Sequence, residues 1–365
     1  QLIYFLLIMK IGILTYHRAN NVGALLQNFA LLKIFERNGI VAETIEYKCK
    51  KIEQANRIIS KRSVKDIVKI LMHLYAFVSR EFKFKRFRKK YINSSSKVYS
   101  RANINFCESC YDAICVGSDQ VWNMNLNGND TTYLLDFVED LKKRIAYAGS
   151  FGYTSIPNEY LQETIEELSK FNSISVREDT AKIMLSDFDI ASNTVLDPTL
   201  LLSGKEWVKA FNLNKRIEKK YVFVYMVAYT PYIIKKAEDI AQKKGYELWI
   251  MHYSYKPYPN CKNIRNATPD EFLNYIYNAQ LVLCSSFHAV CFSILFHKNF
   301  YYSLDKNKNN NNSRLTSLCN HLTLDRDVDK FKETPIDYID VEKRLMSLRN
   351  ESLDYITNTI NSLQS

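Results

Sequence analysis

The chain has 365 residues, of which 47% are hydrophobic and 24% charged, and its formal net charge is +11. That length predicts two domains and excludes a single small module, while the composition excludes global disorder because it supplies enough apolar side chains for sizeable cores. The eight cysteines are scattered, which favours reduced thiols in a cytoplasmic protein over a disulfide framework.

An apolar run, QLIYFLLI, precedes Met9, which is a candidate natural start. Eight apolar residues are too few to span a bilayer, and neither a basic region nor a small-residue cleavage site marks a signal peptide. Elsewhere, too, the chain contains no run of 18 apolar residues. We therefore expect a cytoplasmic location, with peripheral association at the inner membrane face as the alternative.

Strand-like runs alternate with helical patterns in two series, which predicts parallel sheets with crossover helices. The first series has expected strands at 11–15, 42–46, 113–116, 144–148 and 173–176, and a helix at 24–38. The second has expected strands at 221–226, 247–251, 281–284 and 300–302, and helices at 231–244, 269–278 and 287–296.

These series predict an α/β fold of two Rossmann-like domains facing a cleft. We expect the first domain over residues 9–200, the second over 201–338, and a C-terminal helix over 339–365 that packs back on the first. The Asn-rich stretch at 306–314 is an expected loop.

The positive charge is concentrated in one segment, residues 48–101, an expected helical insertion in the first domain. It holds 17 Lys and Arg against three acidic residues, so the rest of the chain is slightly acidic. Such a run is typical of a solvated basic helix pair, and it also fits a surface for an anionic substrate or an anionic membrane. No motif typical of nucleic-acid binding accompanies it, so we expect no nucleic-acid partner.

In open α/β sheets, ligands bind beyond the carboxyl ends of the strands, so the residues that follow each expected strand are site candidates. The first such segment, 15–27, carries His17 and Asn21 in a polar turn before a helix whose N-terminus can hold an anion. It lacks the glycine pattern of a dinucleotide site or a P-loop.

The second segment, ICVGSDQVWN at 114–123, presents Asp119, Gln120 and Trp122 after an apolar strand. A carboxylate, an amide and an indole suit hydrogen bonding and stacking to a sugar. The alternative is that Asp119 caps a short helix and Trp122 belongs to the core.

The third segment, SISVRED at 173–179, brings Arg177 to the sheet edge. An arginine there can bind a phosphate or carboxylate with two hydrogen bonds, or it can pair with the acidic residues that follow it.

The fourth segment, LVLCSSFHAVCFS at 281–293, places Ser285, Ser286 and His288 at the start of a helix. The serines can cap the helix and bind phosphate, while His288 can donate a proton to the same anion. A structural histidine is the alternative. Cys107 and Cys110 form a CxxC pair with no second pair at zinc-site distance, which argues against a metal or redox role.

Six segments in this order, KIGILTYHRANNVGALLQNFAL, VGSDQVWN, SVRED, VLDPTLLL, SSFHAVCFS and NSRLTSL, resemble the polysaccharide pyruvyl transferase family. The resemblance runs from about residue 10 to about residue 324, nearly the whole chain. It implies a fold similar to that of GT-B glycosyltransferases, and transfer of a pyruvyl group from phosphoenolpyruvate to sugar hydroxyls in a precursor of a surface polysaccharide. The implied product is a pyruvate ketal. The sequence leaves open whether the precursor belongs to capsule, to another exopolysaccharide or to a cell-wall polymer.

The resemblance also implies roles for the site residues. His288 would act on the phosphate and in proton transfer, with Ser285 and Ser286 as phosphate ligands. Arg177 and Arg314 would be cations for the donor, since position 286, where some members carry an arginine, is serine here. The acceptor would meet Asp119, a candidate base, together with Gln120, Asn21, His17 and Trp122.

We expect no cofactor beyond phosphoenolpyruvate as donor and no metal, because cations can stabilise a phosphate leaving group. The acceptor would be a sugar or a lipid-linked oligosaccharide. A glycosyltransferase that uses a nucleotide sugar and a non-catalytic sugar-binding protein are the alternatives. The acceptor sugar, the choice between ketal and enol ether, and the oligomeric state are left open by the sequence.

Overall fold

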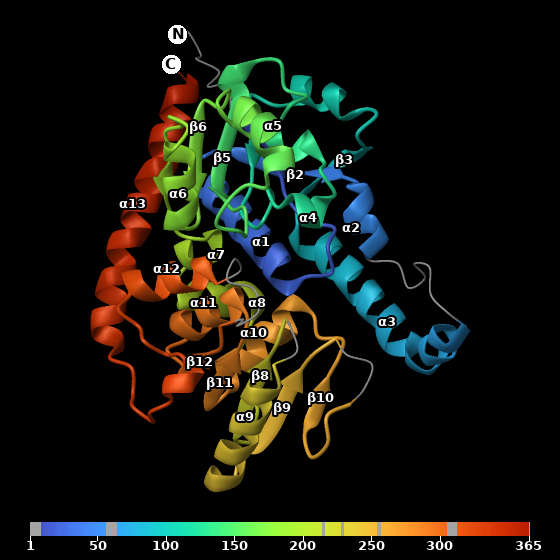
Figure 1. Cartoon of the computed structure of the whole chain (residues 1–365), viewed down its shortest axis with the longest axis vertical. Coiled ribbons are helices and arrows are strands. Elements are labelled where there is room, and N and C mark those ends of the chain that lie inside the picture. Colours follow the sequence, from blue (N-terminus) through green and yellow to red (C-terminus); the bar gives the residue numbers. More distant parts are fainter. Residues whose placement is uncertain are drawn as a thin grey trace, which may run out of the picture. The chain divides into compact units, whose positions relative to one another are not determined.

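The computed structural model describes residues 9–55, 64–213, 216–227, 230–253, 257–304 and 312–364, without the side chains of residues 55 and 64–77. These residues form two compact units (Figure 1). The first lies within residues 1–56, 88–201 and 348–365, and the second within residues 57–87 and 202–347. The middle of the basic segment therefore groups with the second unit, and the end of the last helix groups with the first.

The first unit is built on a seven-stranded parallel sheet with the order β3-β2-β1-β4-β5-β6-β7. Its strands are β1 (Lys10–Leu14), β2 (Val41–Tyr47), β3 (Ser94–Tyr99), β4 (Ala113–Val116), β5 (Arg144–Gly149), β6 (Ser173–Val176) and β7 (Asn193–Thr194). The five strands expected from the sequence are all present, and β3 and β7 are additional.

The additional strands are both at edges of this sheet. β3 has the sequence SSSKVY inside the segment expected to be helical, and it pairs only with β2. β7 has two residues and pairs only with β6. Neither carries an apolar run, because an edge strand is held by backbone pairing on one side and stays open to solvent on the other.

The connections of the first unit contain short and medium helices. They are α1 (Val22–Arg37), α2 (Lys50–Ala55), α4 (Met124–Asn127), α5 (Asn158–Leu168), α6 (Asp179–Ser186) and α7 (Pro198–Leu201), with 3-10 turns η1 (Ile104–Cys110), η2 (Thr131–Leu134) and η3 (Leu141–Lys143). Two long helices, α3 (Val64–Tyr91) and α13 (Tyr338–Gln364), have residues in both units. In the first unit, Tyr355 and Thr359 of α13 hydrogen-bond to Ser173 on β6.

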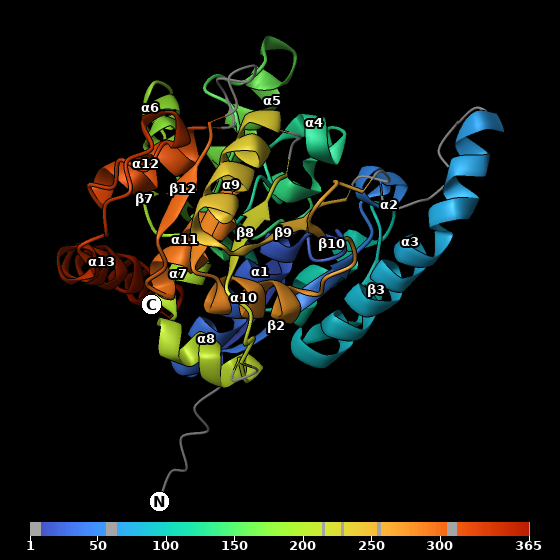
Figure 2. The same ribbon diagram turned by 90° about the horizontal axis from the view of Figure 1, so that it is seen from below.

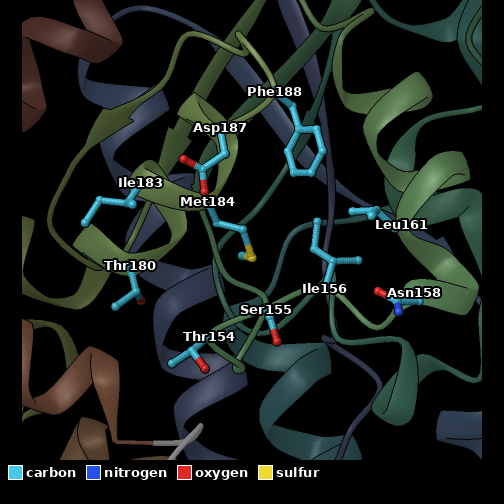
Figure 3. Close-up of a pocket in the computed structure, with 10 residues that line it drawn as sticks. All are labelled: Thr154, Ser155, Ile156, Asn158, Leu161, Thr180, Ile183, Met184, Asp187 and Phe188. Carbon is cyan, nitrogen blue, oxygen red and sulfur yellow. The ribbon is translucent and has the colours of Figure 1, made fainter.

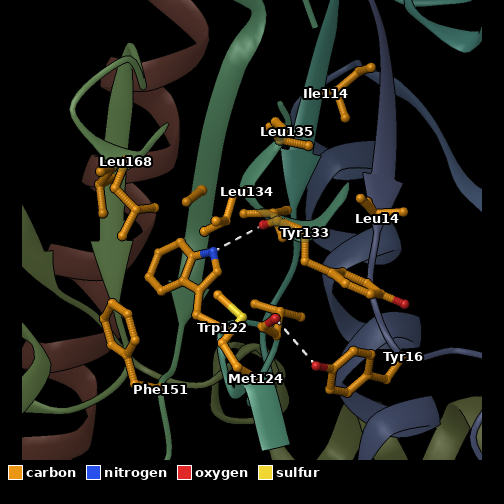
Figure 4. Close-up of a cluster of buried hydrophobic side chains, with 14 of the residues drawn as sticks. Leu14, Tyr16, Ile114, Trp122, Met124, Tyr133, Leu134, Leu135, Phe151 and Leu168 are labelled. Atoms are coloured by element: carbon orange, nitrogen blue, oxygen red, sulfur yellow. Dashed lines mark hydrogen bonds between the residues drawn. The ribbon is translucent and has the colours of Figure 1, made fainter. Parts of the chain in front are cut away.

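A cluster of large aromatic side chains forms the core beside β4 and β5 (Figure 4). Trp122 is fully buried, its indole nitrogen donates to the Tyr133 carbonyl at 3.1 Å, and its ring centroid lies 5.1 Å from that of Phe151. A Cβ on Gly149 of β5 would lie 2.5 Å from the Trp122 ring, so this position requires glycine. The indole therefore packs directly on the backbone of the sheet.

The second unit holds a five-stranded parallel sheet with the order β10-β9-β8-β11-β12. Its strands are β8 (Tyr221–Tyr225), β9 (Glu247–Met251), β10 (Lys262–Ile264), β11 (Leu281–Cys284) and β12 (Phe300–Tyr302). Its further elements are α8 (Gly204–Phe211), α9 (Pro231–Lys244), α10 (Pro269–Asn278), α11 (Phe287–Leu295), α12 (Ser313–His321) and the turn η5 (Val328–Lys330).

Figure 2 shows the helices of the second unit, α8 to α12, and local signals set their ends. α10 begins with a capping box between Thr268 and Glu271, and α9 ends at Gly245, which adopts the left-handed conformation. α8 and α11 pack through Trp207 and Phe292, whose rings meet edge to face at 4.9 Å. Among the described helices, none combines the length and apolar character that crossing a membrane requires.

Gly204 marks the closest approach between α8 and α11. A Cβ at this position would lie 2.1 Å from the carbonyl oxygen of Leu295. Because that neighbour is backbone, it cannot rotate away. The two helices can therefore pack at this distance only with glycine at the start of α8.

Replacing Gly204 with alanine should lower the free energy of unfolding by about 1–3 kcal/mol, because the added methyl group forces a backbone shift. Urea denaturation measures this change. Lys205→Ala is the matched control: Lys205 is exposed on the same helix, and its loss should change the stability by less than about 0.5 kcal/mol. Equal stability of G204A and the wild type would contradict the close packing.

Candidate functional site

The strand exits of the first unit meet at the carboxyl edge of its sheet. Asp119, after β4, forms a bridge with Gly149 at the end of β5. The backbone nitrogen of Arg177, after β6, donates to the Gly149 carbonyl at 3.1 Å. Thr15, after β1, donates from its hydroxyl to the Ser118 carbonyl at 3.0 Å. Segments far apart in sequence thus supply one polar edge.

Arg177 is the buried charge at this edge. Its side chain is 1% exposed, and its Nη1 donates to Oδ2 of Asp197 at 2.8 Å. Its Nη2 lies 3.6 Å from Oδ1 of Asp119. Asp197 also accepts from the Ser118 hydroxyl at its Oδ2, at 3.1 Å, and from the Thr199 hydroxyl at its Oδ1, at 2.7 Å. The loop before α7 is therefore tied to the exits of β4 and β6.

The carboxylates around Arg177 keep it charged. Burial works against the positive charge, but Asp197, Asp119 and Glu178 outweigh it and raise the guanidinium pKa. Glu178 is itself buried and accepts a hydrogen bond from the Ser150 hydroxyl at 2.7 Å. In this arrangement Arg177 positions carboxylates. A donor anion, the ligand expected for Arg177 from the sequence, would have to compete with Asp197 for this guanidinium.

Asp119 is the partly exposed carboxylate of the group. Its side chain is 14% exposed, and its backbone φ of 84° is uncommon for a residue other than glycine. Its Oδ1 accepts from the backbone nitrogen of Gln120 at 2.9 Å, while none of the described residues hydrogen-bonds to its Oδ2. Strained backbone conformations are concentrated at functional sites. Asp119 thus has one oxygen fixed and one available to a ligand hydroxyl.

Trp122 belongs to the core, which is the alternative that the sequence left open, and Gln120 is buried as well. Trp122 is 0% exposed in the aromatic core, which corrects the expectation that its ring stacks on a sugar. Gln120 is also buried, and its Oε1 accepts from Asn123 at 3.2 Å. A Cβ on Gly152 would lie 2.5 Å from the Gln120 amide carbon. This packing corrects the expectation that Gln120 orients the acceptor.

His17 is the buried member of a polar group that it forms with Glu46 and Arg18. Its side chain is 1% exposed, and its Nε2 lies 3.2 Å from Oε2 of Glu46, which also pairs with Arg18. This burial corrects the expectation that His17 lines the acceptor side. Asn21 caps α1, because its Oδ1 accepts from the backbone nitrogens of Gly23 and Ala24 at 2.9 and 3.3 Å. Asn21 is exposed and can still donate through its amide nitrogen.

The second unit places its expected site residues at the first turn of α11. Ser286 is the N-cap, and its hydroxyl accepts from the backbone nitrogen of Ala289 at 3.4 Å. The Ser285 hydroxyl accepts from the backbone nitrogen of Val227 at 3.3 Å. A hydroxyl that accepts can still donate its proton, so both serines can bind an anion. His288, in the same turn, is 8% exposed.

Arg314 joins this turn from α12. Its guanidinium carbon lies 5.8 Å from the ring centroid of Phe287, and the Phe287 ring meets that of His288 at 5.4 Å. A helix N-terminus carries partial positive charge, which the guanidinium reinforces. The structure thus places Ser285, Ser286 and His288 at the start of α11, with the guanidinium of Arg314 beside Phe287 of the same turn.

A separate cavity of about 370 Å³ lies beside α5 and α6 in the first unit (Figure 3). Its lining combines polar and apolar side chains: Thr154, Ser155, Ile156, Asn158, Leu161, Thr180, Ile183, Met184, Asp187 and Phe188. None of the residues singled out from the sequence lines it. The position of this cavity therefore gives no information on the roles of the candidate site residues.

The cysteine pair shows no sign of reactivity. Cys107 is fully buried, and burial first and the charge of Cys110 second raise the pKa of its thiol to about 12. Cys110 is exposed, and both are free thiols. Within the described ranges, no group of three or more His, Cys, Asp and Glu side chains could hold a metal ion.

The most important residue without an assigned role in the sequence analysis is Asp197. It stands in the VLDPTLLL segment, which contributed to the family resemblance but to none of the candidate site residues. Its 0% exposed side chain and its pairing with Arg177 appear only in three dimensions. A lone carboxylate between apolar residues was the available signal, because buried carboxylates are almost always paired.

Arg177→Ala should lower the free energy of unfolding by about 3–5 kcal/mol, because it leaves the buried carboxylate of Asp197 without its partner. Arg101→Ala is the control: Arg101 pairs with Asp136 but is 55% exposed, and its loss should cost less than about 1 kcal/mol. Chemical denaturation measures the free energy of unfolding of both variants. Equal losses would mean that the buried pair contributes no more than a surface pair.

The Glu46 group should make stability depend on pH in acid. Burial favours the neutral form of Glu46, but its hydrogen bond and charge interaction with His17, and then those with Arg18, outweigh burial and lower its pKa from 4.5 to about 2. Because the unfolded chain binds the proton more readily in that range, this stabilisation is present above pH 4.5 and is lost as the pH falls towards 2.

Glu46→Gln removes the titrating group, so the variant should lose less stability than the wild type over that range. Denaturation midpoints measured along the pH series test this. Parallel losses in both proteins would contradict the assignment.

Comparisons with solved structures show the fold. An α-glucosyltransferase in complex with UDP and a 13-mer DNA containing an HMU base is 9% identical, with 98% of this chain and 100% of that chain covered and a TM-score of 0.50. The UDP-GlcNAc 2-epimerase of Methanocaldococcus jannaschii is 12% identical, with 94% and 93% covered and a TM-score of 0.47. The chain has an α/β fold of the GT-B type, with parallel sheets in two Rossmann-like domains.

A search of curated proteins gave no match. A family model, described as polysaccharide pyruvyl transferase, matches residues 21–304, and this range contains the polar sheet edge around Asp119 and the first turn of α11. The chain therefore belongs to the polysaccharide pyruvyl transferase family.

Proposed function

We propose that this protein transfers the pyruvyl group of phosphoenolpyruvate to hydroxyls of a sugar in a surface polysaccharide precursor, forming a pyruvate ketal. A proton adds to carbon 3 of the donor, which makes carbon 2 electrophilic. A sugar hydroxyl then adds to carbon 2 and loses its proton. Phosphate leaves, and a second hydroxyl of the sugar adds to the same carbon and loses its proton, which closes the ketal.

The observation that carries this proposal is the cationic first turn of α11. Phosphoenolpyruvate has a phosphate and a carboxylate, so its site needs cations and hydrogen-bond donors. The Arg314 guanidinium, the two serine hydroxyls and the N-terminus of α11 supply both. His288, in the same turn, is the proposed acid that protonates carbon 3. In the second unit this turn is therefore the proposed donor site.

Asp119 is the proposed base for the acceptor hydroxyl. Its Oδ1 is fixed by the backbone of Gln120 and lies near Arg177, while Oδ2 is available. A carboxylate held in this way can orient a hydroxyl and accept its proton. Arg177 acts through Asp119 and Asp197, as a positioning residue. Asn21, exposed at the start of α1, is a further candidate donor to the sugar.

None of these steps uses a metal ion, because cations and helix-terminal dipoles can stabilise the leaving phosphate. The acceptor is proposed to be a sugar or a lipid-linked oligosaccharide. A nucleotide-sugar glycosyltransferase has the same fold, so the fold does not separate the two activities. The donor substrate separates the two activities, because one uses phosphoenolpyruvate and the other uses a nucleotide sugar.

Binding of phosphoenolpyruvate should raise the melting temperature, because a ligand that binds the native state stabilises it. We expect this shift with phosphoenolpyruvate and not with UDP or GDP, and we expect Arg314→Ala to abolish it. Arg344→Ala is the control, because Arg344 is an exposed arginine of the same unit that pairs with Asp340. A shift with a nucleoside diphosphate alone would contradict the proposal.

Two further variants separate chemistry from binding. His288→Gln and Asp119→Asn keep the size of the side chain and remove the acid and the base. Each should lower turnover by about 100-fold or more, and Asp119→Asn should leave the melting-temperature shift with phosphoenolpyruvate unchanged. Unchanged turnover in either variant would remove that residue from its role.

A further inference from the structure

One face of α3 carries exposed apolar side chains next to cations. Phe82 is 67% exposed and Val78 is 50% exposed, and they lie one helical turn apart. Lys85 and Arg86 are exposed beside them, and neither makes an ion pair with a described residue. At about 100° per residue, positions 78, 82 and 85 fall within about 60° of one another, with Arg86 at the margin.

The opposite face of α3 is already occupied within the second unit. Phe84 and Phe87 are buried, and Phe87 stacks on Phe211 at 5.8 Å. Arg80 lies over the ring of Tyr253 at 4.7 Å, and Lys83 pairs with Glu271 at 3.1 Å. The side chains on this opposite face therefore have their contacts inside the second unit. Val78, Phe82, Lys85 and Arg86 lie on the remaining face of the helix, and each of them is exposed.

The chemistry of this face fits an anionic lipid surface. An exposed phenylalanine gains free energy in the headgroup boundary of a bilayer, and lysine and arginine can hold their charges at lipid phosphates while their aliphatic stems lie on the apolar layer. A soluble polyanion would satisfy the cations but leave Phe82 and Val78 in water. The surrounding segment, residues 48–101, has 17 basic residues against three acidic ones, which an anionic surface attracts.

We infer that the face formed by Val78, Phe82, Lys85 and Arg86 binds the surface of an anionic phospholipid bilayer. Phe82 enters the headgroup boundary, and the two cations contact lipid phosphates. This binding goes beyond the proposed transfer reaction and does not depend on it. It would hold the protein beside any lipid-linked acceptor, but its measurement needs neither donor nor acceptor.

Another exposed apolar residue in the same unit provides a matched control. Ile339, at the start of α13, is 87% exposed, more than Phe82, but its neighbours Asp337 and Asp340 are acidic. Apolar exposure without cations should not bring a side chain to an anionic surface. Ile339 thus separates the contribution of the exposed apolar side chain from the contribution of the neighbouring cations.

Sedimentation with vesicles tests the inference on the full chain. We expect the protein to bind vesicles of phosphatidylcholine mixed with phosphatidylglycerol and not vesicles of phosphatidylcholine alone, with weaker binding at high salt. Phe82→Ser and the double variant Lys85→Glu/Arg86→Glu should each weaken binding by about tenfold or more. Ile339→Ser should bind as the wild type does. All four side chains are exposed, so the melting temperatures should stay unchanged.

Tryptophan fluorescence tests the orientation. The three native tryptophans, Trp122, Trp207 and Trp249, are buried and give a background that the wild type measures, so the difference between a variant and the wild type reports the environment of the added tryptophan. Phe82→Trp should give a blue shift when anionic vesicles are added and should be quenched by brominated lipid. Ile339→Trp should give neither response.

Three results would overturn the inference. The first is equal binding to neutral and anionic vesicles, or no binding to either. The second is vesicle binding that Phe82→Ser leaves unchanged, which would indicate attraction to charge anywhere on the protein. The third is self-association of the wild type in sedimentation equilibrium that Phe82→Ser abolishes, without any vesicle binding. That result would assign the face to a second copy of the chain.

Discussion

The ion pair between Arg177 and Asp197 is the interaction on which the polar edge of the first unit depends. Both side chains are almost completely buried, so neither charge is stable there without the other. The pair joins the exit of β6 to the loop before α7, and Arg177 also faces Asp119 after β4. Asp119 can therefore keep a strained backbone conformation with one carboxylate oxygen fixed and the other available.

The two units contribute different chemistry. The first presents carboxylates whose positions a buried arginine controls, which suits the activation of a hydroxyl. The second presents Arg314, His288 and two serines at a helix N-terminus, which suits a phosphate. The GT-B fold is shared by enzymes with different donors, so the fold alone does not decide the reaction. The reaction proposed above therefore rests on the charges and hydrogen-bond donors of these side chains.

Much of the fold could be predicted from the sequence, because buried parallel strands are continuous apolar runs. The edge strand β3 could not, since its serine-rich sequence is fixed by pairing with β2. At the site, the local sequence pattern identified the segments that follow the strands, but it did not predict the direction in which each side chain of these segments points. Trp122 and His17 follow strands as ligand-binding residues do, yet both are buried. The partnership of Asp197 with Arg177 joins distant segments, so no local pattern could reveal it.

The most direct test of the proposed reaction is the product formed from phosphoenolpyruvate labelled with carbon-13 at carbon 3. The protein would be incubated with this donor, a UDP-sugar and a panel of simple hexosides, and followed by carbon and phosphorus NMR. The account predicts a labelled methyl group on a ketal carbon, together with release of inorganic phosphate in equal amount. Transfer of the sugar from the UDP-sugar, with phosphoenolpyruvate unchanged, would contradict it.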